Sequence, residues 1–172
     1  LAIPNLEIRR LFIKQIREWF RETSQSDGET LNEFCNAFPR QNPKKIEELF
    51  GDYLWNTISI RDTAVAKEKK ENFYHGILLG LLGYKSSWLI KSNAESGTGY
   101  SDILVEVPNN RTGIVIELKY AGNGDLDAAC AEALKQMEEK SYVDKLKQDG
   151  MRNFIKYGIA CFKKDCRVVI AG

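Results

Sequence analysis

The apolar and polar positions between residues 92 and 120 alternate in a pattern that predicts two strands joined by a tight turn. The first strand begins at Asp102, and the second returns through an apolar run that ends near Lys119. The pair Asn109–Asn110 suits the turn because asparagine tolerates a positive φ. A turn centred on this pair places Asp102 opposite Glu117 and Tyr100 opposite Lys119. The predicted register therefore decides which side chains meet across the hairpin.

Two charged residues, Glu117 and Lys119, interrupt the otherwise apolar second strand. Side chains alternate along a strand, so Asp102, Glu117 and Lys119 are predicted to share one face of the hairpin. Burying charge there is costly unless the charges are paired or bind a metal ion. Two carboxylates and a lysine suit a hard cation such as Mg²⁺ together with a phosphate group. The alternative at this point is a solvent-facing charge pair on an ordinary hairpin.

Residues 1–62 have helical periodicity and are predicted to form a helical connector or subdomain. Asn42 and Pro43 predict a helix start, with asparagine as the cap and proline in the first turn. The helices of this part are predicted over residues 5–22, 29–38 and 43–58.

Residues 63–172 are predicted to form an α/β domain with the core order α-β-β-β-α-β-β. A helix between the third and fourth strands implies a crossover, and hence a mixed sheet with helices on both faces. Asp125 is placed to cap this crossover helix, and Ala129 and Ala133 predict that it packs tightly on a sheet. The predicted helices cover residues 64–82, 126–140 and 142–148, and the predicted strands cover residues 85–91, 102–107, 113–119, 153–162 and 166–170.

Four further polar residues are candidates for the same site. Glu71 and His75 lie four residues apart on one predicted helix, so they share a helix face. Glu95 lies in the loop before Asp102 and could reach the same metal ion directly or through water. Gln136 lies on the edge of the alanine face, where it could hydrogen-bond to a carboxylate, a water or a phosphate. The plain alternatives are a core histidine for His75, the single histidine of the chain, and an exposed loop carboxylate for Glu95.

The formal net charge is +1, so nucleic-acid binding would need a local basic patch rather than a global charge. No apolar run approaches the ~20 residues that span a bilayer, and no secretory signal pattern is present, so we expect a cytoplasmic setting and no membrane partner. The sequence also contains none of the glycine-rich motifs that mark nucleotide-binding loops, and it lacks the glycine-flanked motif of a nucleophilic serine. Because the chain begins with Leu1 rather than methionine, we expect it to be the C-terminal part of a longer protein.

The combined spacing of these residues resembles that of the PD-(D/E)XK nuclease superfamily over roughly residues 65–172. More narrowly, it is similar to the domain found at the C-terminus of prokaryotic AAA-ATPase-like proteins. The pattern is a helix with Glu71 and His75, a loop with Glu95, then Gly99-Tyr-Ser-Asp102, Glu117-Leu-Lys119 and finally Gln136 and Tyr142. This resemblance implies a restriction-endonuclease-like fold, a mixed β-sheet flanked by helices.

The resemblance also implies roles for individual residues. Asp102 and Glu117 would be ligands of Mg²⁺ or Mn²⁺, with the Leu118 carbonyl as a third ligand, and Lys119 would be the catalytic lysine. Glu71 or His75 would be the contribution of the first helix, and Gln136 the auxiliary residue of the later one. The substrate would be nucleic acid, with DNA favoured, and an ATPase domain would precede this one in the full-length chain.

One position departs from the pattern of many relatives, which carry Gly-Arg-x-Asp where this chain has Tyr100 in place of the basic residue. A tyrosine there could stack on a base instead of pairing with a phosphate. Two alternatives to catalysis stay open at this point. The domain could be an inactive module that binds nucleic acid or a partner ATPase domain, or the charged pair could be purely structural.

Overall fold

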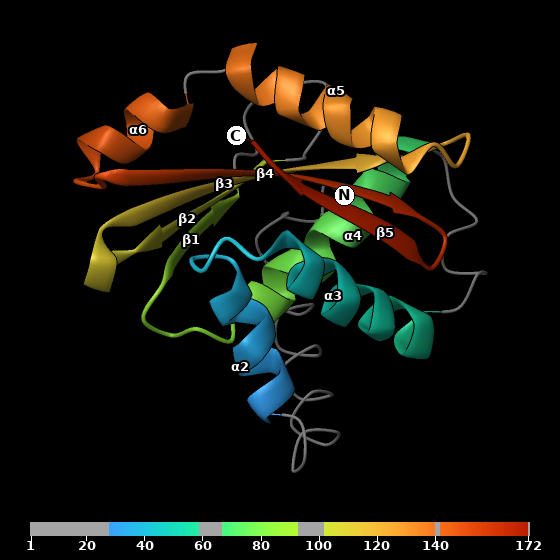
Figure 1. The fold of residues 1–172 in the computed structure, drawn as a ribbon, viewed down its shortest axis with the longest axis horizontal. Coiled ribbons are helices and arrows are strands. Elements are labelled where there is room, and N and C mark those ends of the chain that lie inside the picture. The colour runs from blue at the N-terminus through green and yellow to red at the C-terminus, as the bar shows by residue number, and fades with distance from the viewer. Residues whose placement is uncertain (1–27, 59–66, 93–101, 140–141, 172) are drawn as a thin grey trace, which may run out of the picture.

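The computed structural model describes residues 28–58, 67–92, 102–139 and 142–171 (Figure 1). The predicted helix over residues 5–22 lies outside this part. The described helices are α2 (Gly28–Ala37), α3 (Pro43–Thr57), α4 (Lys67–Leu82), α5 (Leu126–Glu139) and α6 (Tyr142–Gln148). The described strands are β1 (Leu89–Ser92), β2 (Asp102–Val107), β3 (Thr112–Tyr120), β4 (Asn153–Phe162) and β5 (Asp165–Ile170). None of the described helices is long and apolar enough to cross a membrane.

Within the described residues the strands form one sheet in the order β1-β2-β3-β4-β5. Strands β3 and β4 run parallel, and the other neighbours are antiparallel. Helices α5 and α6 make the crossover between the two parallel strands and cover one face, while α2, α3 and α4 cover the other (Figure 1). The predicted mixed sheet with helices on both faces is therefore confirmed.

The register of the central hairpin is the one predicted from the turn, with Asp102 opposite Glu117 and Val107 opposite Thr112. The reason given for the turn was wrong in one respect. Pro108–Asn110 forms a short 3₁₀ turn, and the positive φ of 51° falls on Arg111 rather than on an asparagine. Proline fixes the φ with which the 3₁₀ turn begins, and the left-handed residue that closes the turn is Arg111. The register is unaffected because the connection still contains four residues.

The first strand is shorter than predicted, since β1 begins at Leu89 instead of residue 85. The backbone after α4 continues in turns, with Tyr84 N donating to Leu81 O at 3.2 Å and Trp88 N donating to Lys85 O at 3.1 Å. These bonds use backbone groups that a strand ladder would need. The apolar pattern alone did not reveal this competition.

Both predicted helix caps are present. The side chain of Asn42 accepts a hydrogen bond from Lys45 N at 3.1 Å at the start of α3. The side chain of Asp125 accepts from Ala128 N at 2.9 Å at the start of α5. Each cap satisfies an amide that the helix itself leaves without a partner, so these two starts could be read from the sequence.

The two faces of the sheet have separate apolar cores, and β3 contributes alternate residues to each. Ile114, Ile116 and Leu118 point toward α2, α3 and α4, whereas Val115 packs with residues of α5 and α6. Helices α2 and α3 belong to the same large core as the sheet, to which α2 contributes Phe34, the turn after α2 contributes Phe38, and α3 contributes Ile46, Phe50 and Leu54. The predicted domain boundary at residue 62 lies outside the described part and stays a prediction.

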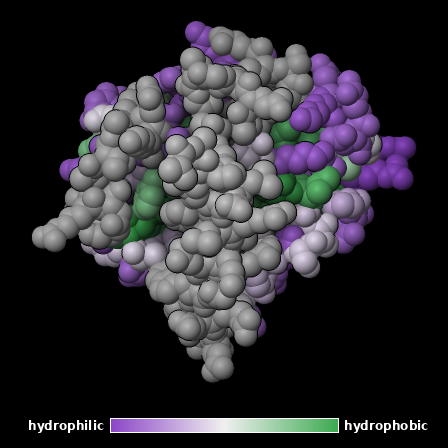
Figure 2. All heavy atoms as spheres, turned by 180° about the vertical axis from the view of Figure 1, so that it is seen from behind, coloured by the Kyte–Doolittle hydropathy of each residue, from purple (hydrophilic) through white to green (hydrophobic). Residues whose placement is uncertain are grey.

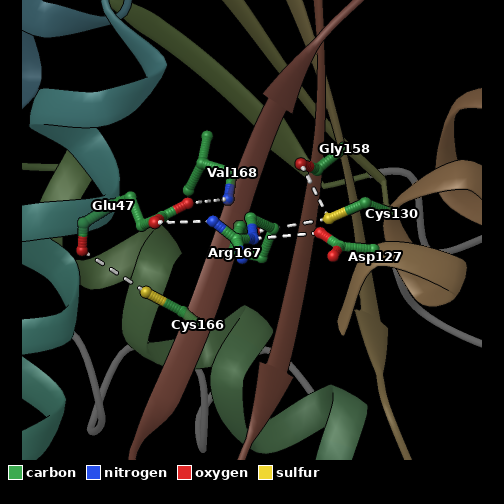
Figure 3. A network of polar contacts seen from close by, with 7 residues as sticks. All are labelled: Glu47, Asp127, Cys130, Gly158, Cys166, Arg167 and Val168. Atoms are coloured by element: carbon green, nitrogen blue, oxygen red, sulfur yellow. Dashed lines mark hydrogen bonds and ion pairs between the residues drawn. The ribbon is translucent and has the colours of Figure 1, made fainter. Parts of the chain in front are cut away.

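The edge strand β5 is held by helices from both faces (Figure 3). The Glu47 carboxylate on α3 accepts a hydrogen bond from Val168 N at 2.8 Å and pairs with Arg167 at 3.3 Å. Arg167 also pairs with Asp127 on α5, at 3.0 Å. Because Glu47 occupies an outward-facing amide of β5, this edge is less open to pairing with another strand.

Candidate active site

The charged pair of β3 is buried. The Glu117 side chain has no solvent-exposed surface, and the Lys119 side chain is 12% exposed. The Lys119 Nζ lies 3.3 Å from Glu117 Oε1, so the two form an ion pair on one face of the strand. They have the same orientation as Val115, which places them on the face that α5 and α6 cover. The solvent-facing alternative is thereby excluded for this pair.

Gln136 of α5 joins this pair from above the sheet, since its Oε1 accepts a hydrogen bond from Lys119 Nζ. The lysine ammonium is therefore held between a strand carboxylate and a helix amide. This contact fixes the position of a side chain that would otherwise have many rotamers. The structure thus brings together Glu117, Lys119 and Gln136, three of the residues chosen from the sequence.

The approach of α5 depends on a residue that sequence reasoning missed, Gly158 of β4, which lies beside Glu117 in the parallel register. A Cβ atom at this position would lie 3.0 Å from the carbonyl oxygen of Cys130 and 3.3 Å from Cβ of Ala133. The prediction of tight packing from the helix alanines is confirmed. The available signal was a glycine inside an apolar strand, which often marks a close approach of another backbone.

Glu71 of α4 lies at the end of β3, where its carboxylate accepts a hydrogen bond from Tyr120 N at 3.1 Å. Backbone groups of residues two apart in a strand point to the same side, so the Leu118 carbonyl lies on the same edge as the Tyr120 amide. Ala121 N donates to Cys161 O of β4 at 2.9 Å, so the amide of the preceding residue points away from β4, toward the side of β2 on which Asp102 is located. Glu71 thus reaches the edge of the site although its helix covers the other face of the sheet.

His75 is placed differently. It is 6% exposed, and its Nε2 lies 3.4 Å from the hydroxyl of Ser92 at the end of β1. Ser92 pairs with Ile103, whose side chain belongs to the core under α4. His75 therefore lies on the opposite face of the sheet from Glu117 and Lys119.

The oxygen donors of the site fit a hard cation. Asp102 is opposite Glu117 in the backbone register, and the Leu118 carbonyl is on the edge that faces β2. Carboxylate and carbonyl oxygens are the ligands that Mg²⁺ and Mn²⁺ prefer. Glu95 and Tyr100 lie outside the described residues. Among the side chains that are described, no group of three or more His, Cys, Asp or Glu residues gathers closely enough to hold a metal ion.

Comparison with known proteins agrees with this architecture. A family model for the PD-(D/E)XK nuclease superfamily matches residues 69–170, more than half of the chain. This range contains α4, the whole described sheet and both crossover helices. No curated protein and no solved structure matches the chain. Members of this superfamily generally hydrolyse phosphodiester bonds and typically use Mg²⁺ or Mn²⁺. With its mixed sheet, its flanking helices and this match, the chain belongs to the PD-(D/E)XK nuclease superfamily and has a restriction-endonuclease-like fold.

Proposed function

We propose that this chain hydrolyses phosphodiester bonds of nucleic acid with Mg²⁺ or Mn²⁺. The observation that carries the proposal is the buried ion pair of Glu117 and Lys119, opposite Asp102 on the neighbouring strand, in a member of a nuclease superfamily. DNA is favoured over RNA by the family resemblance. The same resemblance supports the chain as part of a longer, ATPase-linked protein.

The burial of the pair supports a role beyond stability. Two desolvated charges seldom stabilise a fold more than well-packed apolar residues of similar volume would. Every neighbouring position of β3 from Ile114 to Leu118 except Glu117 is apolar, so an apolar residue would be easy to accommodate there. A carboxylate in this setting is consistent with selection for chemistry at the expense of stability.

Asp102, Glu117 and the Leu118 carbonyl would hold the metal ion. When bound, the ion would polarise the phosphate and lower the pKa of a water molecule. Glu117 can serve such an ion while it remains paired with Lys119, because a carboxylate has two oxygens. The apolar surroundings of Glu117 would strengthen these electrostatic interactions by excluding water.

Lys119 would supply positive charge to the phosphate oxygens as negative charge develops on them, or orient the attacking water. Gln136 positions the ammonium for this role, since it holds Lys119 from the side of α5. A donor that is already in place needs no reorganisation during the reaction. The pair of contacts to Glu117 and Gln136 therefore supports Lys119 as the group that faces the substrate.

A cleavage assay tests the proposal. The full chain is incubated with end-labelled single-stranded and duplex DNA, and separately RNA, in the presence of Mg²⁺ or Mn²⁺. We expect Glu117→Gln and Lys119→Ala each to reduce cleavage by about 100-fold or more while circular dichroism shows a folded protein. Glu132→Gln and Lys135→Ala change the same residue types at exposed positions of α5 and should cleave like the unaltered chain.

Unchanged cleavage in either site variant would refute the assignment. If the unaltered chain cleaves nothing, calorimetry with Mn²⁺ separates the two remaining functions. If Mn²⁺ binding is lost in Asp102→Asn, the proposed metal site is supported. If Mn²⁺ binding does not depend on Asp102, the non-catalytic module is favoured.

A further inference from the structure

Lysines lie against aromatic rings along one end of the sheet. This is the end at which β3 and β4 finish and the turn to β5 begins (Figure 1). We call this surface the β4–β5 rim. It is formed by residues of four elements and of the turn between β4 and β5: Trp55, Lys70, Tyr120, Phe162, Lys163 and Lys164.

Each lysine of the rim lies over a ring. The ammonium of Lys70 is 4.7 Å from the ring centroid of Tyr120, and that of Lys163 is 4.9 Å from Phe162. The rings of Tyr120 and Phe162 are themselves 6.0 Å apart, so these four side chains form a continuous row. Cation–π contacts of this kind hold an ammonium in place while leaving its hydrogen-bond donors directed toward solvent.

The row continues to Trp55 at the end of α3. The Lys164 ammonium lies 5.3 Å from the centroid of the indole ring. Trp55 is 63% exposed, the largest exposed fraction among the large hydrophobic side chains described. An indole that is so accessible and has a fixed cation beside it offers both a stacking surface and a charge.

The rim leads to the candidate active site. The Tyr120 side chain lies on the opposite face of the sheet from that of Lys119, and the two faces meet at the end of β3, where the Glu71 carboxylate accepts a hydrogen bond from the Tyr120 amide. Lys70 precedes Glu71 in α4. The surface at the other end of β4, near α6, differs from the rim in its charge. It is hydrophilic when seen from behind (Figure 2), and α6 contributes both acidic and basic residues to it. Lys147 in that region is paired with Asp144 at 3.3 Å.

From this arrangement we infer that the β4–β5 rim binds a single-stranded segment of nucleic acid and directs it around the end of β3 toward Lys119. The inference rests on the proposed function for the identity of the ligand class. The lysines hold successive phosphates, and one unpaired base stacks on Trp55. Aromatic stacking with backbone-tracking cations is the common mode of binding single strands, and bases in an intact duplex do not offer their faces for stacking.

A structural role of Lys164 makes a different prediction. Its ammonium donates a hydrogen bond to the carbonyl oxygen of Trp55 at 2.8 Å, which caps the C-terminal end of α3. The cap uses the backbone of Trp55 and not its indole. Removal of the ring therefore leaves the cap intact, and Trp55→Ala separates binding from helix capping.

The test measures fluorescence anisotropy of labelled oligothymidylate and of a labelled duplex of equal length, with the full chain in EDTA so that no cleavage occurs. We expect Trp55→Ala to weaken single-strand binding about tenfold and duplex binding much less. Tyr84→Ala removes another exposed aromatic residue, 46% exposed and outside the rim, and should bind like the unaltered chain.

A second matched pair tests the lysines. Lys163→Ala and Lys147→Ala each remove an ammonium that lies over a phenylalanine of β4, Phe162 in the first case and Phe154, at the opposite end of the strand, in the second. We expect only Lys163→Ala to weaken single-strand binding and to lower its salt dependence.

Three results would overturn the inference: no single-strand binding by the unaltered chain, unchanged affinity in Trp55→Ala, or equal losses for single strand and duplex. These outcomes are independent of the cleavage assay. If cleavage depends on Lys119 but single-strand binding does not depend on Trp55, the proposed function is supported and the role of the rim is refuted. If single-strand binding depends on Trp55 but no nucleic acid is cleaved, the role of the rim is supported and the proposed catalysis is refuted.

Discussion

Replacing the buried pair of β3 by apolar residues tests whether the two charges stabilise the fold only together. The perturbations are Lys119→Met, Glu117→Leu and the double variant. Both new side chains are close in length or volume to the originals and have no charge. Because the pair is coupled at 3.3 Å and one partner is fully buried, we expect a large interaction energy in a double-mutant cycle.

The magnitudes follow from burial. Lys119→Met leaves the Glu117 carboxylate, which is 0% exposed, without its ion pair, and should lower the free energy of unfolding by about 3 kcal/mol. Glu117→Leu should cost only about 1 kcal/mol, because the lysine keeps its bond to Gln136 and is 12% exposed. The double variant should differ from the unaltered chain by about 1 kcal/mol or less, so the coupling is about 3 kcal/mol.

Urea unfolding followed by circular dichroism measures these differences, with cleavage assayed on the same samples. We expect the double variant to be stable and inactive. Single-variant losses that simply add in the double variant would refute the coupling. A double variant that keeps full cleavage would show that the pair serves the fold and not the reaction.

Two further pairs of variants test packing at two glycines, one in β4 and one in α4, and the salt bridges of Lys91 in β1. Gly158→Ala should lower the free energy of unfolding by about 2 kcal/mol and disturb the site, because the new Cβ lies 3.0 Å from a carbonyl oxygen. Gly76→Ala should raise the free energy of unfolding by about 0.5 kcal/mol, because a Cβ there has nothing within 4 Å. Thermal melts that rank the two variants alike would contradict this. Lys91→Met should lower the free energy of unfolding by about 2 kcal/mol, because it removes the 2.6 Å salt bridge of the Glu106 carboxylate, which is 8% exposed. Asp149→Asn should change the free energy of unfolding little, because the Asp149 salt bridge lies at the surface. The hydrogen bond from Lys91 lowers the pKa of Asp149, so its contribution is present above pH 3.8 and disappears as the pH falls through the lowered pKa. The hydrogen bond to Glu106 raises the pKa of Lys91, so the contribution of Lys91 to stability is complete below pH 10.5 and disappears as the pH rises through the raised pKa. Unfolding curves of the unaltered chain and of both variants, measured across pH, test these two directions.

The hairpin and its register were predictable because they depend on local information. The alternation of apolar residues and the length of the turn connection are enough to place Asp102 opposite Glu117. Helix caps such as Asn42 and Asp125 are equally local. The crossover was predictable too, because a helix between two strands restricts how those strands can pair.

The faces of the sheet were not predictable in the same way. Glu71 and His75 share a helix pattern that says nothing about which side of the sheet the helix covers. In the structure α4 lies opposite α5, so Glu71 reaches the site only at the strand end and His75 packs against Ser92. Gly158 was missed because its importance depends on the approach of α5, a contact between residues far apart in the chain.

The most direct test of the account is anomalous diffraction from a crystal of the full chain grown with Mn²⁺. We predict a peak about 2 Å from carboxylate oxygens of both Asp102 and Glu117 and from the Leu118 carbonyl. This prediction is contradicted if saturating Mn²⁺ gives no peak there, or if the two carboxylates point to opposite sides of the sheet.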